Sequence, residues 1–145
     1  MIDSVVISGV ITPSFCGAAI GAEVWVDQHC VINSEHVDSA ITFEHTLSDS
    51  DGEHELRIVM KHKQAAHTQL DEQGNIVQDA VLTLSDLEFD RLNVMQIVAE
   101  QSKYSHNFNG SQPDGIHRFY GDMGCNGTVS LKFTTPVYLW LLENM

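Results

Sequence analysis

The acidic stretch 49–55 contains the side chains best suited to holding a metal ion. Asp49, Asp51 and Glu53 alternate along it, and Ca²⁺ prefers about six to eight oxygen ligands. An EF-hand is excluded, because the register that fits two of these acids puts Leu47 and Ile58 at ligand positions. The stretch predicts either a non-EF calcium site or a solvated acidic turn before the next strand. The solvated turn is the preferred interpretation, so we expect no cofactor, with calcium as the alternative.

The other reactive side chains lack the spacing that catalysis or zinc binding requires. The eight histidines form no His-Glu-x-x-His or His-x-His motif, and neither Gly-x-Ser-x-Gly nor Ser-x-x-Lys occurs. Cys16, Cys30 and Cys125 form no Cys-x-x-Cys pair and are expected to be reduced and mostly buried. We expect no enzymatic activity and scattered surface histidines. The alternative is a metal-dependent enzyme built on scattered histidines and carboxylates.

A segment of asparagines and aromatic residues is the candidate ligand-binding site. Tyr104, Asn107, Phe108 and Asn109 lie in the Asn-, Gly- and Ser-rich segment 104–115, and long loops of compact domains are often functional. Exposed aromatic rings can stack on sugar rings, and neighbouring amides can form hydrogen bonds to sugar hydroxyls. The segment therefore predicts a glycan-binding loop, although asparagine is also common in loops because it favours turns.

Length and charge limit the classes of protein to which the chain can belong. Its 145 residues predict a single domain over residues 1–145. Seven Lys and Arg against 20 Asp and Glu give a net charge of −13, which argues against binding to nucleic acid or to an anionic membrane. The N-terminus shows no secretory signal pattern, and the longest apolar run, 137–142, is too short to span a bilayer.

Short runs of alternating polar and apolar residues recur along the chain, whereas a sustained helical period is hard to find. They predict strands in 4–11, 23–27, 30–32, 41–45, 55–61, 81–84 and 87–89, and a turn at 71–75. Such runs are typical of antiparallel sheets. We predict an all-β fold, an antiparallel β-sandwich that is jelly-roll-like. The pattern of segment 94–102 fits either a strand or one short helix.

The C-terminal third gives the sharpest local predictions. Asn126-Gly127 is a strong signal for a two-residue hairpin turn, here between segment 116–123 and the alternating strand 128–133. The apolar run 137–142 predicts a last buried strand that pairs or packs at a subunit contact. Leu139 is accordingly expected to be essential to the fold or to a homo-oligomer.

Two segments resemble parts of carbohydrate-binding β-sandwich modules. Asp51–Ile58 resembles the Gly-x-His-x-Leu strand start of jelly-roll modules, and Val81–Asp90 resembles a late strand of calcium-dependent xylan-binding modules. The two segments cover less than a third of the chain, and no residue here matches the calcium or sugar ligands of that family. The resemblance implies a β-sandwich.

As a whole, the chain resembles small proteins of marine tailed phages that infect cyanobacteria (cyanophages). The matching segments are His54–Lys63, Asp71–Val77 and Gly121–Pro136. That family has no defined activity, so the resemblance implies a viral origin and a role in virion structure or host interaction. It also implies a location in the virion or in the host cytoplasm.

These observations together predict a non-enzymatic virion structural or binding module that acts by surface recognition of a protein subunit or a glycan. The first alternative is a Ca²⁺-dependent carbohydrate-binding module whose acidic loop supplies ligands. The second is an acidic host-interaction protein that binds a basic host factor through contacts that salt would screen.

Overall fold

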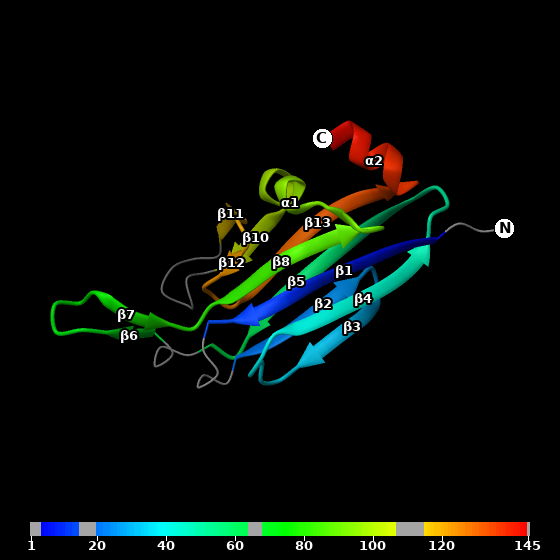
Figure 1. Ribbon diagram of the computed structural model, residues 1–145. Helices are drawn as coiled ribbons and strands as arrows, with labels where there is room; N and C mark the ends of the chain where they lie inside the picture. The colour runs from blue at the N-terminus through cyan, green and yellow to red at the C-terminus, as the bar shows by residue number, and fades with distance from the viewer. Residues whose placement is uncertain (1–3, 15–19, 64–67, 107–114, 145) are drawn as a thin grey trace.

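The computed structural model describes residues 4–14, 20–63, 68–106 and 115–144, and Figure 1 shows their arrangement. Most strands belong to two antiparallel sheets, a two-stranded hairpin projects from them, and two short helices lie on the same side of the strands. The predicted all-β antiparallel β-sandwich is confirmed, with two helices rather than one. Among the described residues, no helix has both the length and the hydropathy that crossing a membrane requires.

The smaller sheet is built on β1 (Ser4–Pro13), the β-branched segment expected near the N-terminus. β1 pairs with β4 (Ile41–Ser48) on one side and with β8 (Leu82–Phe89) on the other. β8 also pairs with the short strands β9 (Leu92–Asn93) and β12 (Asp122–Met123). Alternate residues of β1 face the core and are buried, as a period of two dictates: Val5, Ile7 and Ile11.

The larger sheet has six strands in the order β11-β10-β13-β5-β2-β3. Their bounds are β2 (Gly21–Val26), β3 (His29–Ser34), β5 (Gly52–Lys61), β10 (Lys103–His106), β11 (Gly115–Arg118) and β13 (Gly127–Thr135). β5 and β13 are central, and their alternate residues enter the core. The inward face predicted for Val129, Leu131 and Phe133 is confirmed, since all three are buried.

The projecting hairpin consists of β6 (Thr68–Leu70) and β7 (Ile76–Asp79). It turns at the predicted segment 71–75, where the Asp71 carboxylate accepts hydrogen bonds from the backbone N–H groups of Gln73 and Asn75, each 2.9 Å long. An aspartate that binds the backbone following it is a common way of stabilising a turn, and the turn prediction is confirmed.

The two helices resolve one open prediction and overturn another. Segment 94–102 contains α1 (Met95–Gln101). The run 137–142, predicted as a strand, lies in α2 (Val137–Asn144), so that prediction is wrong. A short apolar run fits either structure. Here the buried residues are Val137, Trp140 and Leu141, whose i, i+3, i+4 spacing defines one face of a helix.

Asn126-Gly127 does not form the predicted hairpin turn. Gly127 begins β13, which pairs with β10 and β5 rather than with the segment before it. Asn126 bonds to Lys63 beyond the end of β5, through its Oδ1 to the backbone N and through its Nδ2 to the backbone O, each at 2.8 Å. A Cβ on Gly127 would lie 2.3 Å from the Ser105 backbone oxygen. The glycine therefore permits two strands to approach closely.

Candidate functional site

Helix α2 is held on the sandwich by its buried face and by a cap from a distant turn. Trp140 packs against Phe89 of β8 and Phe133 of β13, with ring centroids 5.6 and 6.0 Å away. Oδ1 of Asp49 accepts a 2.8 Å hydrogen bond from the backbone N–H of Val137, the first residue of the helix. Because the first N–H groups of a helix have no partner within it, this contact acts as the cap.

The opposite side of α2 exposes large apolar side chains. Tyr138, Leu139 and Leu142 are 53%, 59% and 74% exposed. Single exposed apolar residues are normal, but several together are typical of a surface that contacts another molecule. The predicted role of Leu139 in the fold is therefore wrong, and its role in an oligomer stays a prediction.

A groove of about 370 Å³ separates α1 from α2. Its walls come from β9 and the two helices, and they comprise Leu92, Asn93, Gln96, Ile97, Glu100, Leu141 and Asn144. Ile97 and Leu141 are buried, whereas Leu92 is exposed at the rim. We call this groove, together with Tyr138, Leu139 and Leu142, the helical surface.

A second hollow, of about 660 Å³, lies on the outer face of the smaller sheet. Its lining residues are Val6, Ser8, Glu44, Glu88, Asp90, Arg91 and Tyr138. Three carboxylates and one guanidinium give it a formal charge of −2, and we call it the acidic hollow. Within the described part of the chain, none of these four charged groups forms an ion pair.

The turn from β8 to β9 lies between the acidic hollow and the helical surface. Its two residues, Asp90 and Arg91, have φ values of 50° and 69°. A residue with a Cβ adopts this left-handed backbone at a cost of about 1–2 kcal/mol. Asp90 offsets that cost through two 2.8 Å hydrogen bonds with Val6, one donated by its backbone N and one accepted by its Oδ1. The turn thereby fixes Arg91 at the hollow and Leu92 at the groove.

His54 of β5 connects three parts of the molecule at the end of the sandwich that carries α2. Its Nδ1 lies 2.7 Å from Oδ2 of Asp27, and its Nε2 lies 3.1 Å from Oγ1 of Thr135. The Thr135 hydroxyl in turn donates to the carbonyl oxygen of Ser50. The imidazole also stacks on Phe133, with a centroid distance of 5.3 Å. We call Asp27, His54, Thr135 and Ser50 the His54 network.

Asp27 is the anchor of this network. It follows β2 in the left-handed region, with φ of 54°, which aspartate tolerates better than most residues. Its Oδ1 accepts a 2.9 Å hydrogen bond from the backbone N–H of Glu55. Burial by itself would raise the pKa of Asp27, but the hydrogen bonds from His54 and from Glu55 outweigh it and hold the pKa below its usual value.

A carboxylate, an imidazole and a hydroxyl in a row resemble a catalytic relay, but their surroundings here support a structural role. Thr135 is only 5% exposed, and its hydroxyl hydrogen is engaged by Ser50. Because the Asp27 carboxylate and the Ser50 carbonyl can only accept, Nδ1 of His54 donates to Asp27 and the Thr135 hydroxyl donates to Ser50. The network joins the β2–β3 turn, the β4–β5 turn and the end of β13, which leads into α2.

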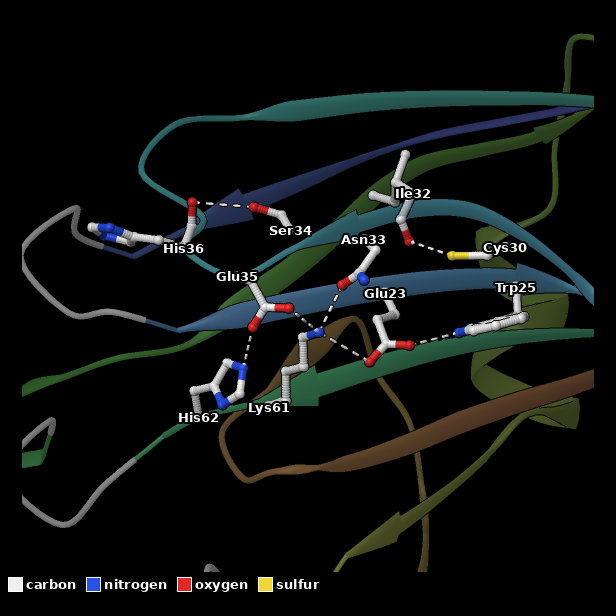
Figure 2. Close-up of polar contacts among 10 residues, drawn as sticks. All are labelled: Glu23, Trp25, Cys30, Ile32, Asn33, Ser34, Glu35, His36, Lys61 and His62. Atoms are coloured by element: carbon white, nitrogen blue, oxygen red, sulfur yellow. Dashed lines mark hydrogen bonds and ion pairs between the residues drawn. The ribbon is translucent and has the colours of Figure 1, made fainter.

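A second polar cluster lies at the other end of β5, and Figure 2 shows it. Nζ of Lys61 contacts Oδ1 of Asn33 at 2.6 Å, Oε1 of Glu35 at 3.1 Å and Oε2 of Glu23 at 3.2 Å. Nε2 of His62 lies 2.6 Å from Oε2 of Glu35. Hydrogen bonds from Lys61 and His62 hold the pKa of Glu35 below its usual value. We call this set the Lys61 cluster.

The predicted calcium ligands are not grouped around one point. Asp49 is half-buried and caps α2, whereas Asp51 and Glu53 are exposed. All three belong to the described residues, and in those residues no group of three or more His, Cys, Asp or Glu side chains could hold a metal ion. Calcium binding stays a prediction, and the structure gives Asp49 a backbone partner instead.

The predicted glycan-binding residues are only partly within the structure. Asn107, Phe108 and Asn109 lie outside the described residues. Tyr104 lies in β10 and is 6% exposed, and its hydroxyl donates to the carbonyl oxygen of Cys125. Burial raises the pKa of Tyr104 to about 12. The expected exposed ring is wrong for Tyr104, because the alternation of β10 turns this residue toward the core.

The cysteines also differ from expectation. Cys30 is exposed and Cys125 is half-buried. The prediction of mostly buried thiols is therefore wrong for Cys30, whereas Cys16 lies outside the described residues.

Four of the histidines form two ring pairs rather than being scattered. His29 contacts His45 with centroids 4.7 Å apart, and His106 contacts His117 at 4.6 Å. Burial, together with the neighbouring imidazole, lowers the pKa of His45 and that of His106. Each pair therefore disfavours two simultaneous positive charges.

Sequence reasoning missed both the helical surface and the His54 network. Two members of the network, Asp27 and Thr135, are separated by 27 and 81 positions from His54, and no local pattern connects them to it. A signal for α2 was present, however. The helical spacing of Val137, Trp140 and Leu141 begins directly after Pro136, and proline is common where helices start.

No protein-family model matches the chain, and neither a curated protein nor a solved structure matches it significantly.

Proposed function

We propose that the protein is a non-enzymatic binding module that recognises another protein through its helical surface. The observation that carries this proposal is the exposed side of α2, where Tyr138, Leu139 and Leu142 are uncovered beside an apolar groove. Burial of one such side chain contributes about 1.5–3 kcal/mol. Binding energy in interfaces is commonly concentrated in a few apolar and aromatic anchors of this kind.

The way in which α2 is attached supports the proposal. Its inner face is fixed by Trp140 between two phenylalanines, and its first turn is capped by Asp49. The helix therefore presents its outer side chains from a rigid base, which lowers the entropic cost of association. A surface of this kind on a rigid sandwich suits recognition better than catalysis.

The setting that we propose follows from the resemblance to cyanophage proteins. The module acts in the virion, where its partner is another structural subunit, or in the host cytoplasm, where its partner is a host protein. In either setting the helical surface makes the contact, so one set of variants tests both.

The test compares exposed leucines on and off the helical surface. Leu139 and Leu70 are both 59% exposed, and Leu70 lies on the projecting β6–β7 hairpin. We expect immobilised wild-type protein and Leu70→Ser to retain the same partner from phage-infected host extract, and Leu139→Ser/Leu142→Ser to lose it. All proteins are first matched for thermal stability.

Equal retention by all three proteins would contradict the proposal, because the contact would then lie elsewhere. Loss with Leu70→Ser alone would move the interface to the hairpin. Retention on a glycan array that survives Leu139→Ser/Leu142→Ser would favour sugar recognition by a different face.

A further inference from the structure

We propose that the partner contacts this protein with an apolar segment flanked by Lys or Arg, placing apolar side chains on the helical surface and basic side chains in the acidic hollow. This inference rests on the proposed function and adds the chemistry of the partner. It follows from the position of the apolar helical surface next to the acidic hollow.

The two surfaces are continuous. Tyr138 belongs to α2 and also lines the acidic hollow. On the other side, Arg91 lines the hollow and the next residue, Leu92, lines the groove. A segment that crosses the β8–β9 turn beside Tyr138 therefore meets an apolar surface and then an acidic one.

The charges of the acidic hollow favour a partner segment that is positively charged. Glu44, Glu88 and Asp90 face the hollow with one opposing charge, that of Arg91. Glu100 adds a fourth carboxylate at the groove. Among the described residues none of these acids is in an ion pair, so each can gain a charge-assisted hydrogen bond from a Lys or Arg of the partner.

The same charges argue against a second copy of this chain as the occupant. A two-fold dimer would bring the same patch of both subunits together. Acidic hollows and molecules that each carry a net charge of −13 would then repel each other. A basic segment is attracted to this surface, whereas a second copy of the chain is repelled by it.

The β8–β9 turn holds the two surfaces in a fixed relation. Asp90 and Arg91 both have left-handed backbone, as the two central residues of a tight β-hairpin turn require. The hydrogen bonds between Asp90 and Val6 keep this turn in place. The turn therefore presents both surfaces in a fixed relation before any partner arrives.

The test uses three fluorescein-labelled synthetic peptides and measures fluorescence anisotropy. The first contains leucines flanked by lysines, the second the same leucines flanked by glutamates, and the third lysines with serines in place of leucines. The proteins are wild type, Leu139→Ser/Leu142→Ser and Glu44→Gln/Glu88→Gln. Leu70→Ser and Asp38→Asn/Glu72→Gln are matched controls, since Leu70, Asp38 and Glu72 are exposed elsewhere.

We expect only the leucine–lysine peptide to bind wild-type protein. Each of the two surface variants should weaken it by about tenfold or more, and the controls by less than about twofold. Raising the salt concentration should weaken binding to wild type more than to Glu44→Gln/Glu88→Gln, because fewer charge contacts remain to be screened in that variant.

The two proposals fail in different ways. If both leucine peptides bind and depend on Leu139 and Leu142 but not on Glu44 and Glu88, a basic partner is excluded while the binding function stands. If the lysine peptides bind every protein equally, the attraction is unspecific and the inference is overturned. If no peptide binds wild type, the inference is likewise overturned, and the extract experiment still decides the proposed function.

Discussion

His54 and His62 lie toward opposite ends of β5 and pair with carboxylates over nearly the same distance, 2.7 Å to Asp27 and 2.6 Å to Glu35. Their surroundings differ. The side chains of the first pair are 19% and 44% exposed, and those of the second are 47% and 70% exposed. Exposed ion pairs are screened by water and contribute little to stability. The pairing distance therefore does not show which of the two contacts contributes more to stability. The burial of the groups around each contact does.

Two tryptophans give the largest expected contrast: Trp140, and Trp25, which lies opposite Arg57 in the middle of β5 and donates through its Nε1 to Glu23 of the Lys61 cluster. Trp140 is 6% exposed and packs among phenylalanines above the His54 network. Trp25 is half-buried beside the Lys61 cluster, with Arg57 over its ring at 5.5 Å. Trp140→Ala should lower the free energy of unfolding by about 3–5 kcal/mol because it leaves a core cavity.

Trp25→Ala should cost less than half as much, since part of its ring is already in water. Urea unfolding followed by circular dichroism measures both changes. Equal losses for the two variants would mean that the two tryptophans are equally buried in solution, which would contradict the expected contrast.

The second prediction tests whether the His54 network itself contributes to stability. Thr135→Val keeps the shape of the side chain but leaves Ser50 without its donor and His54 without a partner at Nε2. Unmade buried hydrogen bonds cost about 1–3 kcal/mol, so the urea midpoint should fall accordingly. The neighbouring Thr134 is exposed, and Thr134→Val is the matched control that should leave the midpoint nearly unchanged.

The third prediction concerns pH. The pKa of Asp27 is lower in the folded protein than its ordinary value of 3.8, so its contribution to stability is present above pH 3.8 and is lost as the pH falls through the folded pKa. Wild-type protein should therefore lose more stability than Asp27→Asn when the pH is lowered from 5 toward 2. Parallel pH curves for the two proteins would show that the His54 contact does not favour the ionised carboxylate.

The smallest effect is expected at the Lys61 cluster. His62→Ala removes the contact with Glu35 at a site open to solvent, where screening leaves little to lose. The thermal midpoint should stay within the error of measurement at about physiological salt. A clear drop in the thermal midpoint that disappears in high salt would show that the Lys61 cluster acts as a cooperative network. The contributions of the two ends of β5 to stability would then be more similar than expected.

Local features of the fold were predictable because neighbouring residues determine them. The alternation of Val129, Leu131 and Phe133 defines an inward face wherever the strand is placed. Asp71 stabilises its own turn through residues two and four positions later. Asn126-Gly127 shows the limit of such reasoning, because the same dipeptide that favours a hairpin here bonds to Lys63 and allows two strands to approach.

The candidate site was much less predictable. Asp49 was a plausible calcium ligand from its acidic neighbours, yet its carboxylate caps a helix 88 positions away. The helical surface needs α1, β9 and α2 together, and a short apolar run such as 137–142 does not by itself distinguish a helix from a strand. Tyr104 has a side chain suited to stacking on a sugar, but strand pairing turned it inward.

By itself, the sequence determined the all-β class, the alternating faces of the central strands, the turn of the projecting hairpin and an acidic surface, because these depend on the order of neighbouring residues and on total charge. The tertiary structure alone decided that the outer, apolar side of α2 is left uncovered, that the β8–β9 turn joins the groove to an acidic hollow, and that the His54–Asp27 pair is less exposed than the His62–Glu35 pair. Those features depend on which distant residues compete for the same buried space, and that competition is settled only when the whole chain packs.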